Sequence, residues 1–258
     1  MTARVLVVEH EANAGIGLVG ERLEAAGIEL LVVGPEAGGE VPETAQGVDG
    51  VIVLGGTPGP TDDDDAAWLP GVRALIGDCL DRELPFLGIC LGAQLLAVVA
   101  GGVVGPARDT AEVGLHPLAL TDEASEDPLL GGLGDDLAAM QWHFLEVLEL
   151  PAGSQSLCRS DGCRNQAFRV GAAAWGVQFH LEALASTAEA WARDDSDDLA
   201  AVGLTRSAVV EPMRSAEPAL RRTWSRVADR WGAIVLAERA ADADADAFSS
   251  ATSGGSAS

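Results

Sequence analysis

Short apolar runs alternate with amphipathic segments from residue 4 to residue 100. The apolar runs have the length of strands buried on both faces, and they cover residues 4–8, 28–33, 48–54 and 84–89. Between them, apolar positions recur every three or four residues, which predicts helices over 18–26 and 72–80. This alternation predicts a parallel, doubly wound α/β sheet, whose active site lies beyond the carboxyl ends of its strands.

The pattern changes after Gly101. Strand-like runs now follow one another with turn residues between them, which indicates antiparallel pairing. They cover residues 113–120, 139–142, 146–150, 165–170 and 175–179, of which the last two are expected to form a hairpin. From Leu220 onward, apolar positions again recur at helical spacing and predict a core helix.

The chain is expected to form one domain over residues 1–238. Its chemistry-bearing core spans 4–183 and its C-terminal helices span 184–238. Residues 239–258 contain Ala-Asp repeats and a Ser/Gly-rich end, a composition typical of disorder.

Charge narrows the range of partners. The 258 residues carry a formal net charge of −24, and all sixteen basic residues are arginine. Such a surface is unsuited to nucleic acid or to an anionic membrane, because little of it can neutralise phosphate. An acidic, lysine-free composition also fits a salt-rich cytoplasm, where salt screens self-repulsion.

The four cysteines, Cys79, Cys90, Cys158 and Cys163, could form two disulfides, but a chain this long does not need them for stability. We expect reduced thiols and a cytoplasmic protein, since no signal peptide is evident. Cys158 and Cys163 form the only close pair, but their C-x4-C spacing has no second half. No metal or cofactor is therefore expected.

Cys90 stands out by its position. It follows an apolar strand, has Gly88 and Gly92 on either side, and precedes good helix-forming residues. This arrangement is typical of a nucleophile elbow, and a helix N-terminus favours a thiolate. The alternative is a buried structural cysteine, and the choice between the two depends on finding a base.

The candidate bases are the four histidines, of which His10 and His116 are expected to be structural. His143 ends a predicted strand and can line the site. His180 also ends a strand, and Glu182 follows two residues later. Residues two apart in an extended chain point to the same side, so Glu182 can orient the His180 imidazole.

Several segments together resemble the class I glutamine amidotransferases. They are residues 88–94 (GICLGAQ), 176–182 (GVQFHLE), 53–56 (VLGG), 141–143 (QWH) and 166–169 (QAFR). The resemblance covers about residues 4–183 and is closest to stand-alone members often labelled GMP-synthase-like. It implies a flavodoxin-like three-layer sandwich with a central, mostly parallel sheet and a small antiparallel extension.

The resemblance also implies site roles. Cys90 would be the nucleophile, His180 the general base and acid, and Glu182 the group that orients His180. The thiolate would attack the glutamine side-chain amide and form a γ-glutamyl thioester, which water hydrolyses.

Four further residues have roles implied in the same way. The backbone N–H groups of Gly56 and Leu91 would form the oxyanion hole. Gln94 would hold the amino-acid end of the substrate, and His143 would contribute to substrate binding.

Two segments depart from the family pattern. Phe144-Leu145 follows His143, where many relatives have Gly-Asp, and this loop borders the glutamine pocket in relatives. Thr57 separates Gly56 from Pro58, where relatives have Gly-Gly-Pro. The first departure affects the expected substrate and the second the oxyanion assignment.

The sequence lacks a phosphate-binding glycine loop with lysine, so ammonia would pass to a separate synthetase subunit. Two alternatives remain open. One is hydrolysis of another γ-glutamyl compound, such as a γ-glutamyl peptide, with the same three residues. The other is a catalytically idle regulatory or binding module of the same fold.

Overall fold

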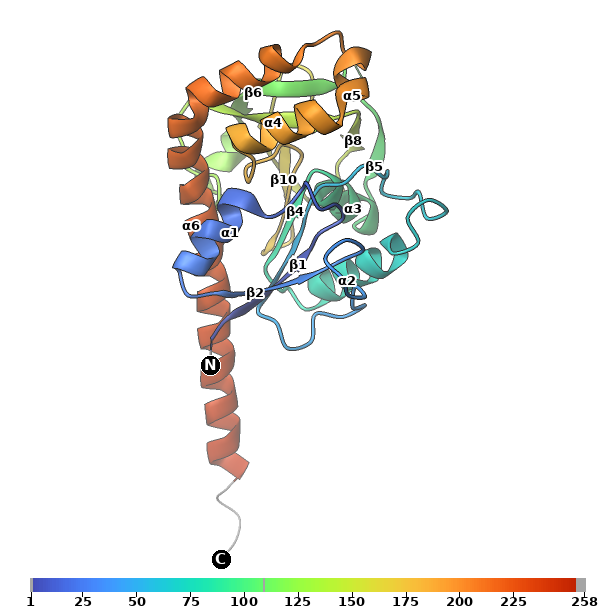
Figure 1. Ribbon diagram of the computed structural model, residues 1–258. Coiled ribbons are helices and arrows are strands. Elements are labelled where there is room, and N and C mark those ends of the chain that lie inside the picture. Colours follow the sequence, from blue (N-terminus) through green and yellow to red (C-terminus); the bar gives the residue numbers. More distant parts are fainter. Residues whose placement is uncertain (1, 109, 254–258) are drawn as a thin grey trace, which may run out of the picture.

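A nine-stranded sheet runs through the molecule (Figure 1). The computed structural model describes residues 2–108 and 110–253, with side chains as far as residue 241. Five neighbouring strands are parallel. In sheet order they are β2 (Glu29–Val33), β1 (Arg4–Val8), β3 (Gly50–Val53), β4 (Phe86–Ile89) and β11 (Ala174–Val177).

Antiparallel strands extend the sheet on the side of β11. In order they are β10 (Ala167–Val170), β9 (Gln155–Arg159), β6 (Glu112–Leu120) and β7 (Leu137–His143). A separate two-stranded antiparallel sheet pairs β5 (Val103–Pro106) with β8 (Leu145–Glu149). The predicted mostly parallel sheet with a small antiparallel extension is therefore confirmed.

Helices cover both faces of the parallel strands (Figure 1). The described helices are α1 (Gly17–Ala25), α2 (Leu69–Asp81), α3 (Leu91–Val99), α4 (Ala185–Asp194), α5 (Ser196–Ala201), α6 (Arg206–Ser253) and a 3-10 turn, Asp122–Glu126. In β1, Val5 and Val7 pack into the core shared with α1 and α6, whereas Leu6 and Val8 pack into the core shared with α2 and α3. This alternation produces the predicted three layers. Within the described residues, no helix is both long and apolar enough to cross a bilayer.

Helix α6 is longer than the sequence pattern predicts. Its inward side contributes Trp224 and Trp231, both almost fully buried, to the core. The expected disordered tail differs from the structure over residues 239–253, where the backbone continues as helix. Alternating alanine explains the helix, because alanine has the highest helix propensity. Residues 254–258 of that tail lie outside the described residues.

Strand β11 connects the parallel and antiparallel halves. The predicted hairpin of β10 and β11 is present, with Phe168 opposite Gly176. The other edge of β11 pairs in parallel with β4, and Val177 lies opposite Ile89. This register brings the segment after β11, including His180, next to the turn after β4, which carries Cys90.

Candidate active site

Cys90 sits in a strained turn between β4 and α3. Its φ of 51° and ψ of −104° are unfavourable for a residue with a side chain. Both flanking glycines are required, since a Cβ on Gly88 would collide with the backbone of Gly92, and one on Gly92 with the backbone of Val53. The sequence prediction of an elbow therefore has a steric basis.

His180 is held between Glu182 and Cys90. Its Nδ1 lies 2.7 Å from Glu182 Oε1, and both side chains are buried. The ring also lies close to Cys90, since a Cβ placed on Gly55 would stand 3.0 Å from His180 Cε1 and 3.4 Å from Cys90 Cβ. The backbone N–H of His180 donates to Met140 O at 2.8 Å, which fixes the position of the residue.

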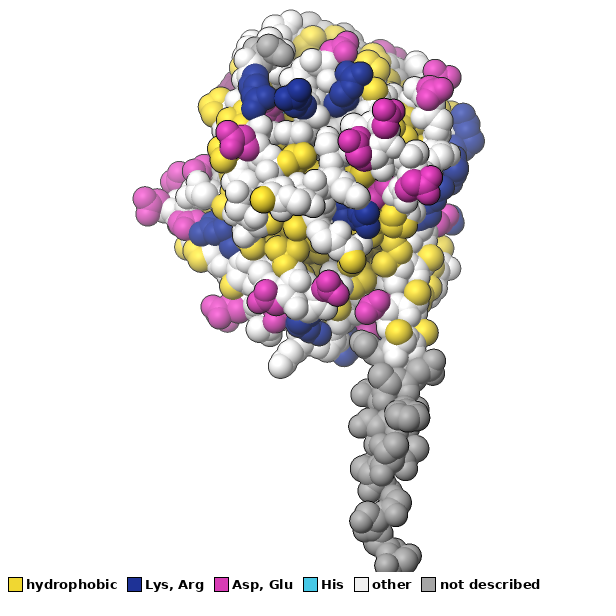
Figure 2. Space-filling view, turned by 180° about the vertical axis from the view of Figure 1, so that it is seen from behind, with side chains coloured by type: hydrophobic (Ala, Val, Ile, Leu, Met, Phe, Trp, Pro, Cys, Tyr) yellow, Lys and Arg dark blue, Asp and Glu magenta, His cyan; other side chains and the backbone are white. Residues whose placement is uncertain are grey.

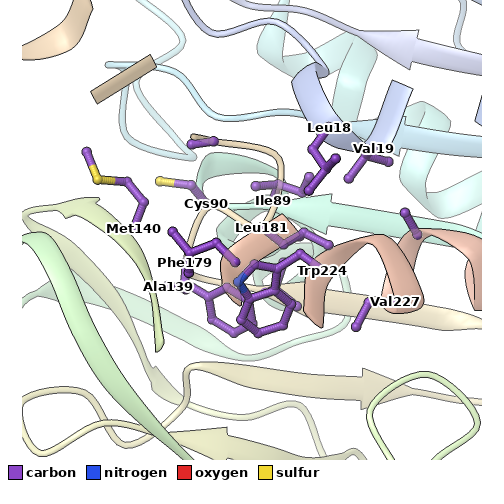
Figure 3. Close-up of a cluster of buried hydrophobic side chains, with 14 of the residues drawn as sticks. Leu18, Val19, Ile89, Cys90, Ala139, Met140, Phe179, Leu181, Trp224 and Val227 are labelled. Atoms are coloured by element: carbon purple, nitrogen blue, oxygen red, sulfur yellow. The ribbon is translucent and has the colours of Figure 1, made fainter. Parts of the chain in front are cut away.

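Buried side chains of the core pack around Cys90 and His180. Figure 3 shows Cys90 beside Met140, with Phe179 and Trp224 packed below. The ring centroids of Phe179 and Trp224 are 4.9 Å apart. Those of Trp191 and His180 are 4.7 Å apart in an edge-to-face arrangement. Helices α4 and α6 therefore help to hold the histidine in place.

The surroundings of His180 favour its charged form. Burial alone would lower the pKa of His180, but the negative charges of Glu182 and Cys90, with the hydrogen bond that His180 donates to Glu182, raise it to about 10. An imidazolium at this position can donate a proton to a leaving group and is stabilised by the carboxylate behind it.

A network of amides continues from Cys90. Gln178 Nε2 donates to Cys90 Sγ at 3.5 Å, and Gln178 Oε1 accepts from Gln94 Nε2 at 3.2 Å. Gln94 Nε2 also lies 3.2 Å from Leu145 O. Sequence reasoning missed the contact between Gln178 and Cys90. The signal was available, because Gln178 precedes His180 by two residues, the spacing that pointed to Glu182.

A cavity of about 160 Å³ opens above Cys90 and His180. Three carboxylate side chains, those of Glu11, Asp195 and Asp198, line it. Its other lining residues are Ala14, Gly55, Gly56, Thr57, Pro58, Gln94, Trp142, His143, Phe144, Leu145 and Trp191. The cavity therefore combines the buried thiol of Cys90 with an acidic lining.

Of the two predicted oxyanion donors, Leu91 follows Cys90 directly and Gly56 lines the same cavity. Among the described residues, neither the N–H of Gly56 nor that of Leu91 donates to a protein acceptor. A Cβ on Gly56 would come within 2.8 Å of His10 Cβ, so His10 packs directly behind it. His10 accepts a hydrogen bond from Trp68 Nε1 at 3.0 Å, and burial lowers its pKa to about 4. It is thus neutral and structural, as expected.

His143 lies in the cavity wall, but its ring nitrogens face protein groups. Nδ1 is 3.0 Å from Leu145 O, and Nε2 is 3.2 Å from Glu112 Oε2. Cys163 Sγ lies within 4.8 Å of both the Glu112 carboxylate and the His143 ring. Burial and the nearby charge of Glu146 raise the pKa of the Cys163 thiol above its usual range. These residues form a group that can hold a metal, and C-x4-C spacing did not indicate it.

The structure thus brings most of the predicted residues to one place. Cys90, His180, Gly56, Gln94 and His143 line the cavity. Glu182 contacts His180 from behind and Leu91 follows Cys90 directly. All four cysteines are free and buried.

Known proteins share this sequence pattern. The family model "Glutamine amidotransferase class-I" matches residues 17–195. The chain is 28% identical over 200 residues to the glutamine amidotransferase-like protein YfeJ of Salmonella typhimurium, covering 76% of this chain and 83% of that protein. It is 37% identical over 138 residues to a glutamine-hydrolysing GMP synthase subunit of Haloarcula marismortui, covering 52% of this chain and 64% of that subunit. A GMP synthase of Porphyromonas gingivalis is 38% identical over 144 residues, which are 55% of this chain and 26% of that protein.

Solved structures show the same architecture. A glutamine amidotransferase from Thermotoga maritima superposes with a TM-score of 0.81 at 25% identity, covering 90% of this chain and 99% of that one. One from Methylobacillus flagellatus gives a TM-score of 0.80 at 26% identity, covering 90% and 94%. The chain belongs to the class I glutamine amidotransferase family.

Proposed function

We propose that this protein hydrolyses the side-chain amide of glutamine through a thioester on Cys90 and supplies the ammonia to a separate synthetase. The observation that carries the proposal is the placement of His180. It lies 2.7 Å from Glu182 on one side and lines the same cavity as Cys90, which sits in a strained turn.

In the first half of the reaction, the Cys90 thiolate attacks the amide carbon of glutamine and forms a C–S bond. The C–N bond then breaks as His180 donates its proton to the departing nitrogen, which leaves as ammonia. Glu182 stabilises the imidazolium and holds the ring in the correct orientation. The product of this half is a γ-glutamyl thioester.

In the second half, neutral His180 takes a proton from water, and the resulting hydroxide attacks the thioester carbon. The C–S bond breaks, glutamate leaves, and the thiolate and imidazolium are restored. Each tetrahedral intermediate carries a negative oxygen, for which the N–H groups of Gly56 and Leu91 are the proposed donors. Removing one such donor typically lowers the rate by about 10²–10³-fold.

The acidic lining bears on substrate binding. Glu11, Asp195 and Asp198 line the same cavity as Cys90. Carboxylates there favour a substrate with a positive charge, such as the α-ammonium group of glutamine. Gln94 and His143 hold the adjoining wall through Leu145 O. We propose that they shape the subsite for the amino-acid end of the substrate.

The acidic lining also favours a second candidate, hydrolysis of a γ-glutamyl compound whose leaving group is a cationic amine. Phe144 is 38% exposed and borders the cavity, where it can contact such a leaving group. The same three residues would perform this reaction. Only the group that accepts the proton from His180 would differ.

The proposal of a separate ammonia acceptor rests on relatives. One relative is named as a subunit of a glutamine-hydrolysing GMP synthase. We propose a comparable arrangement here, with a synthetase that binds near the mouth of the cavity. The expected cytoplasmic location remains a prediction.

Two measurements with the wild type and Cys90→Ala test the proposal: release of ammonia from glutamine, and release of the amine or amino acid from γ-glutamyl amines and dipeptides. Ammonia from glutamine that disappears in Cys90→Ala supports the amidotransferase. Amine release with glutamine ignored supports the second candidate. A wild type that attacks none of these substrates, alone or with a synthetase partner, would leave the idle module.

A further inference from the structure

Behind the wall of the active site lies a second group of chemically reactive side chains. Glu112, His143 and Cys163 place a carboxylate oxygen, an imidazole nitrogen and a sulfur within 4.8 Å of one another, and all three residues are buried. Glu112 begins β6 and His143 ends β7, where the two residues are direct cross-strand partners. Cys163 lies in the turn between β9 and β10. The group is held by strand register, not by a flexible loop alone.

The hydrogen bond of His143 to Leu145 O shows which ring nitrogen carries a hydrogen. Nδ1 lies 3.0 Å from Leu145 O, and a carbonyl can only accept, so Nδ1 carries a proton. Nε2 is 3.2 Å from Glu112 Oε2, yet it makes no hydrogen bond among the described residues. The distance would allow a hydrogen bond, so it is the direction that is unsuitable. In neutral His143 the lone pair is on Nε2, and a cation bound to it would also be close to the Glu112 carboxylate.

This arrangement is the common one for metal-bound histidine. One ring nitrogen binds the metal and the other donates its N–H to a backbone carbonyl or a carboxylate, which fixes the ring. In His143 the carbonyl is that of Leu145.

Other polar atoms around the group also lack partners. Glu146 is buried, its Oε2 has no hydrogen bond among the described residues, and its charge acts on Cys163. Its Oε1 lies 3.7 Å from Arg108 Nε. Glu112 accepts from Ser160 at 2.8 Å and from Gln166 at 2.6 Å, which orients the carboxylate and leaves further lone pairs free. One further buried carboxylate, that of Glu146, thus stands beside the group.

We propose that Glu112, His143 and Cys163 bind one Zn²⁺ ion at a site distinct from Cys90 and His180. A thiolate, an imidazole and a carboxylate are the ligand types that zinc takes, whereas Mg²⁺ and Ca²⁺ prefer oxygen alone. Water or Glu146 is available as a fourth ligand. As the sulfur–zinc bond forms, the thiol proton is released to solvent.

A second cavity lies close to the group. It is lined by Glu146, Ser160 and Gly162 among others, but by none of the three proposed ligands. A Cβ on Gly162 would stand 3.0 Å from Glu112 Oε1, so glycine at this position leaves room between the cavity and the carboxylate.

The metal would act on the active site through His143. Zinc on Nε2 keeps the proton on Nδ1, which donates to Leu145 O. The same carbonyl accepts from Gln94 Nε2, which in turn contacts Gln178 beside Cys90. His143 is then a positioning residue for the cavity wall. The metal site itself does not depend on the proposed reaction.

Metal binding by the full chain tests the proposal. The reduced protein, stripped with chelator, is titrated with Zn²⁺ and with Co²⁺, whose thiolate complexes absorb in the near ultraviolet. The wild type should bind one equivalent and show this absorption. Cys163→Ser should abolish the absorption and weaken zinc binding by on the order of 100-fold or more. The matched control, Cys158→Ser, replaces another buried cysteine and should change neither.

A second measurement does not require any variant to fold. In the wild type under mild denaturant, Zn²⁺ should slow alkylation of Cys163 at least about tenfold, and leave that of Cys158 unchanged. The proposal is overturned if neither metal binds. It is also overturned if binding and absorption survive in Cys163→Ser and are lost in Cys90→Ser, since the metal would then bind at Cys90 and His180.

Discussion

The side-chain amide of Gln178 donates to the sulfur of Cys90 over 3.5 Å, from a residue two positions before His180. The segment after β11 therefore places two side chains near Cys90, the amide of Gln178 and the imidazole of His180. A donor directed at sulfur stabilises negative charge there, and hydrogen bonds to charged groups are worth about 1.5–3 kcal/mol.

Replacing Gln178 with methionine removes that donor and keeps the size of the side chain. We expect Cys90 in Gln178→Met to react with iodoacetamide about tenfold more slowly at neutral pH, with a similar fall in kcat. Gln155→Met, on an exposed amide that contacts Arg169, is the control and should behave as wild type. An unchanged alkylation rate in Gln178→Met would show that the contact has no effect on the sulfur.

The charge of His180 should make stability depend on pH. The folded pKa of His180 is about 10, above its ordinary 6.5, so the folded protein holds a proton that the unfolded chain releases. This contribution to the free energy of unfolding is fully present below pH 6.5 and is lost as the pH rises toward 10. Urea unfolding between these pH values measures it.

Glu182→Gln removes the charge that raises the His180 pKa. The fall in stability between pH 6.5 and 10 should therefore be smaller in this variant than in the wild type, and kcat should fall by at least about 10². Cys79, Cys158 and Cys163 also have raised pKa values, but they are common to both proteins and cancel in the comparison. Identical pH dependence in the two proteins would rule out the coupling.

Gly56→Ala tests the oxyanion proposal. The new Cβ would stand 2.8 Å from His10 Cβ and 3.2 Å from Leu91 Cδ2, so the backbone N–H must move. We expect kcat for glutamine to fall by about 10²-fold with a smaller change in KM. Gly77→Ala, in α2, is the matched control, because its Cβ meets nothing within 4 Å and should leave kcat unchanged.

Helix α6 should contribute strongly to stability through Trp224. This side chain is 2% exposed, packs on Phe179 and donates to Ala138 O at 3.1 Å. Trp224→Ala should lower the free energy of unfolding by about 3–5 kcal/mol. Leu236→Ala on the same helix, where the side chain is 40% exposed, should change it by less than about 0.5 kcal/mol. Similar losses in both variants would contradict the packing account.

The acidic composition predicts a dependence on salt. Acidic side chains are spread over the face shown in Figure 2, with arginines among them. Exposed carboxylates repel one another at a net charge of −24, and about molar salt shortens the screening length to roughly 3 Å. The urea midpoint should rise between low and molar KCl. Equal midpoints would remove the argument for a salt-rich cytoplasm.

Much of the parallel sheet could be predicted from the sequence. Apolar runs that are buried on both faces are unambiguous, and residues 4–8 are a strand in both the prediction and the structure. Most of the candidate site could be predicted from two local patterns. They are the glycines on either side of Cys90 and the two-residue spacing of His180 and Glu182.

Other features depend on distant parts of the chain. Strand β9 was missed because Gln155–Arg159 is mostly polar and buries only Leu157 and Cys158. The parallel pairing of β11 with β4 is a long-range contact, which no local pattern contains. The same is true of Glu112, His143 and Cys163, which meet only through the register of β6 with β7 and the turn after β9.

The proposed reaction requires a γ-glutamyl thioester on Cys90. The protein is mixed with excess glutamine, quenched in acid within milliseconds to seconds, and analysed by mass spectrometry of the intact chain and its peptides. The account predicts an added γ-glutamyl group on the peptide that contains Cys90, sensitive to hydroxylamine and absent from Cys90→Ala. Rapid ammonia release from glutamine with no adduct on Cys90, or with the adduct on another cysteine, would contradict it.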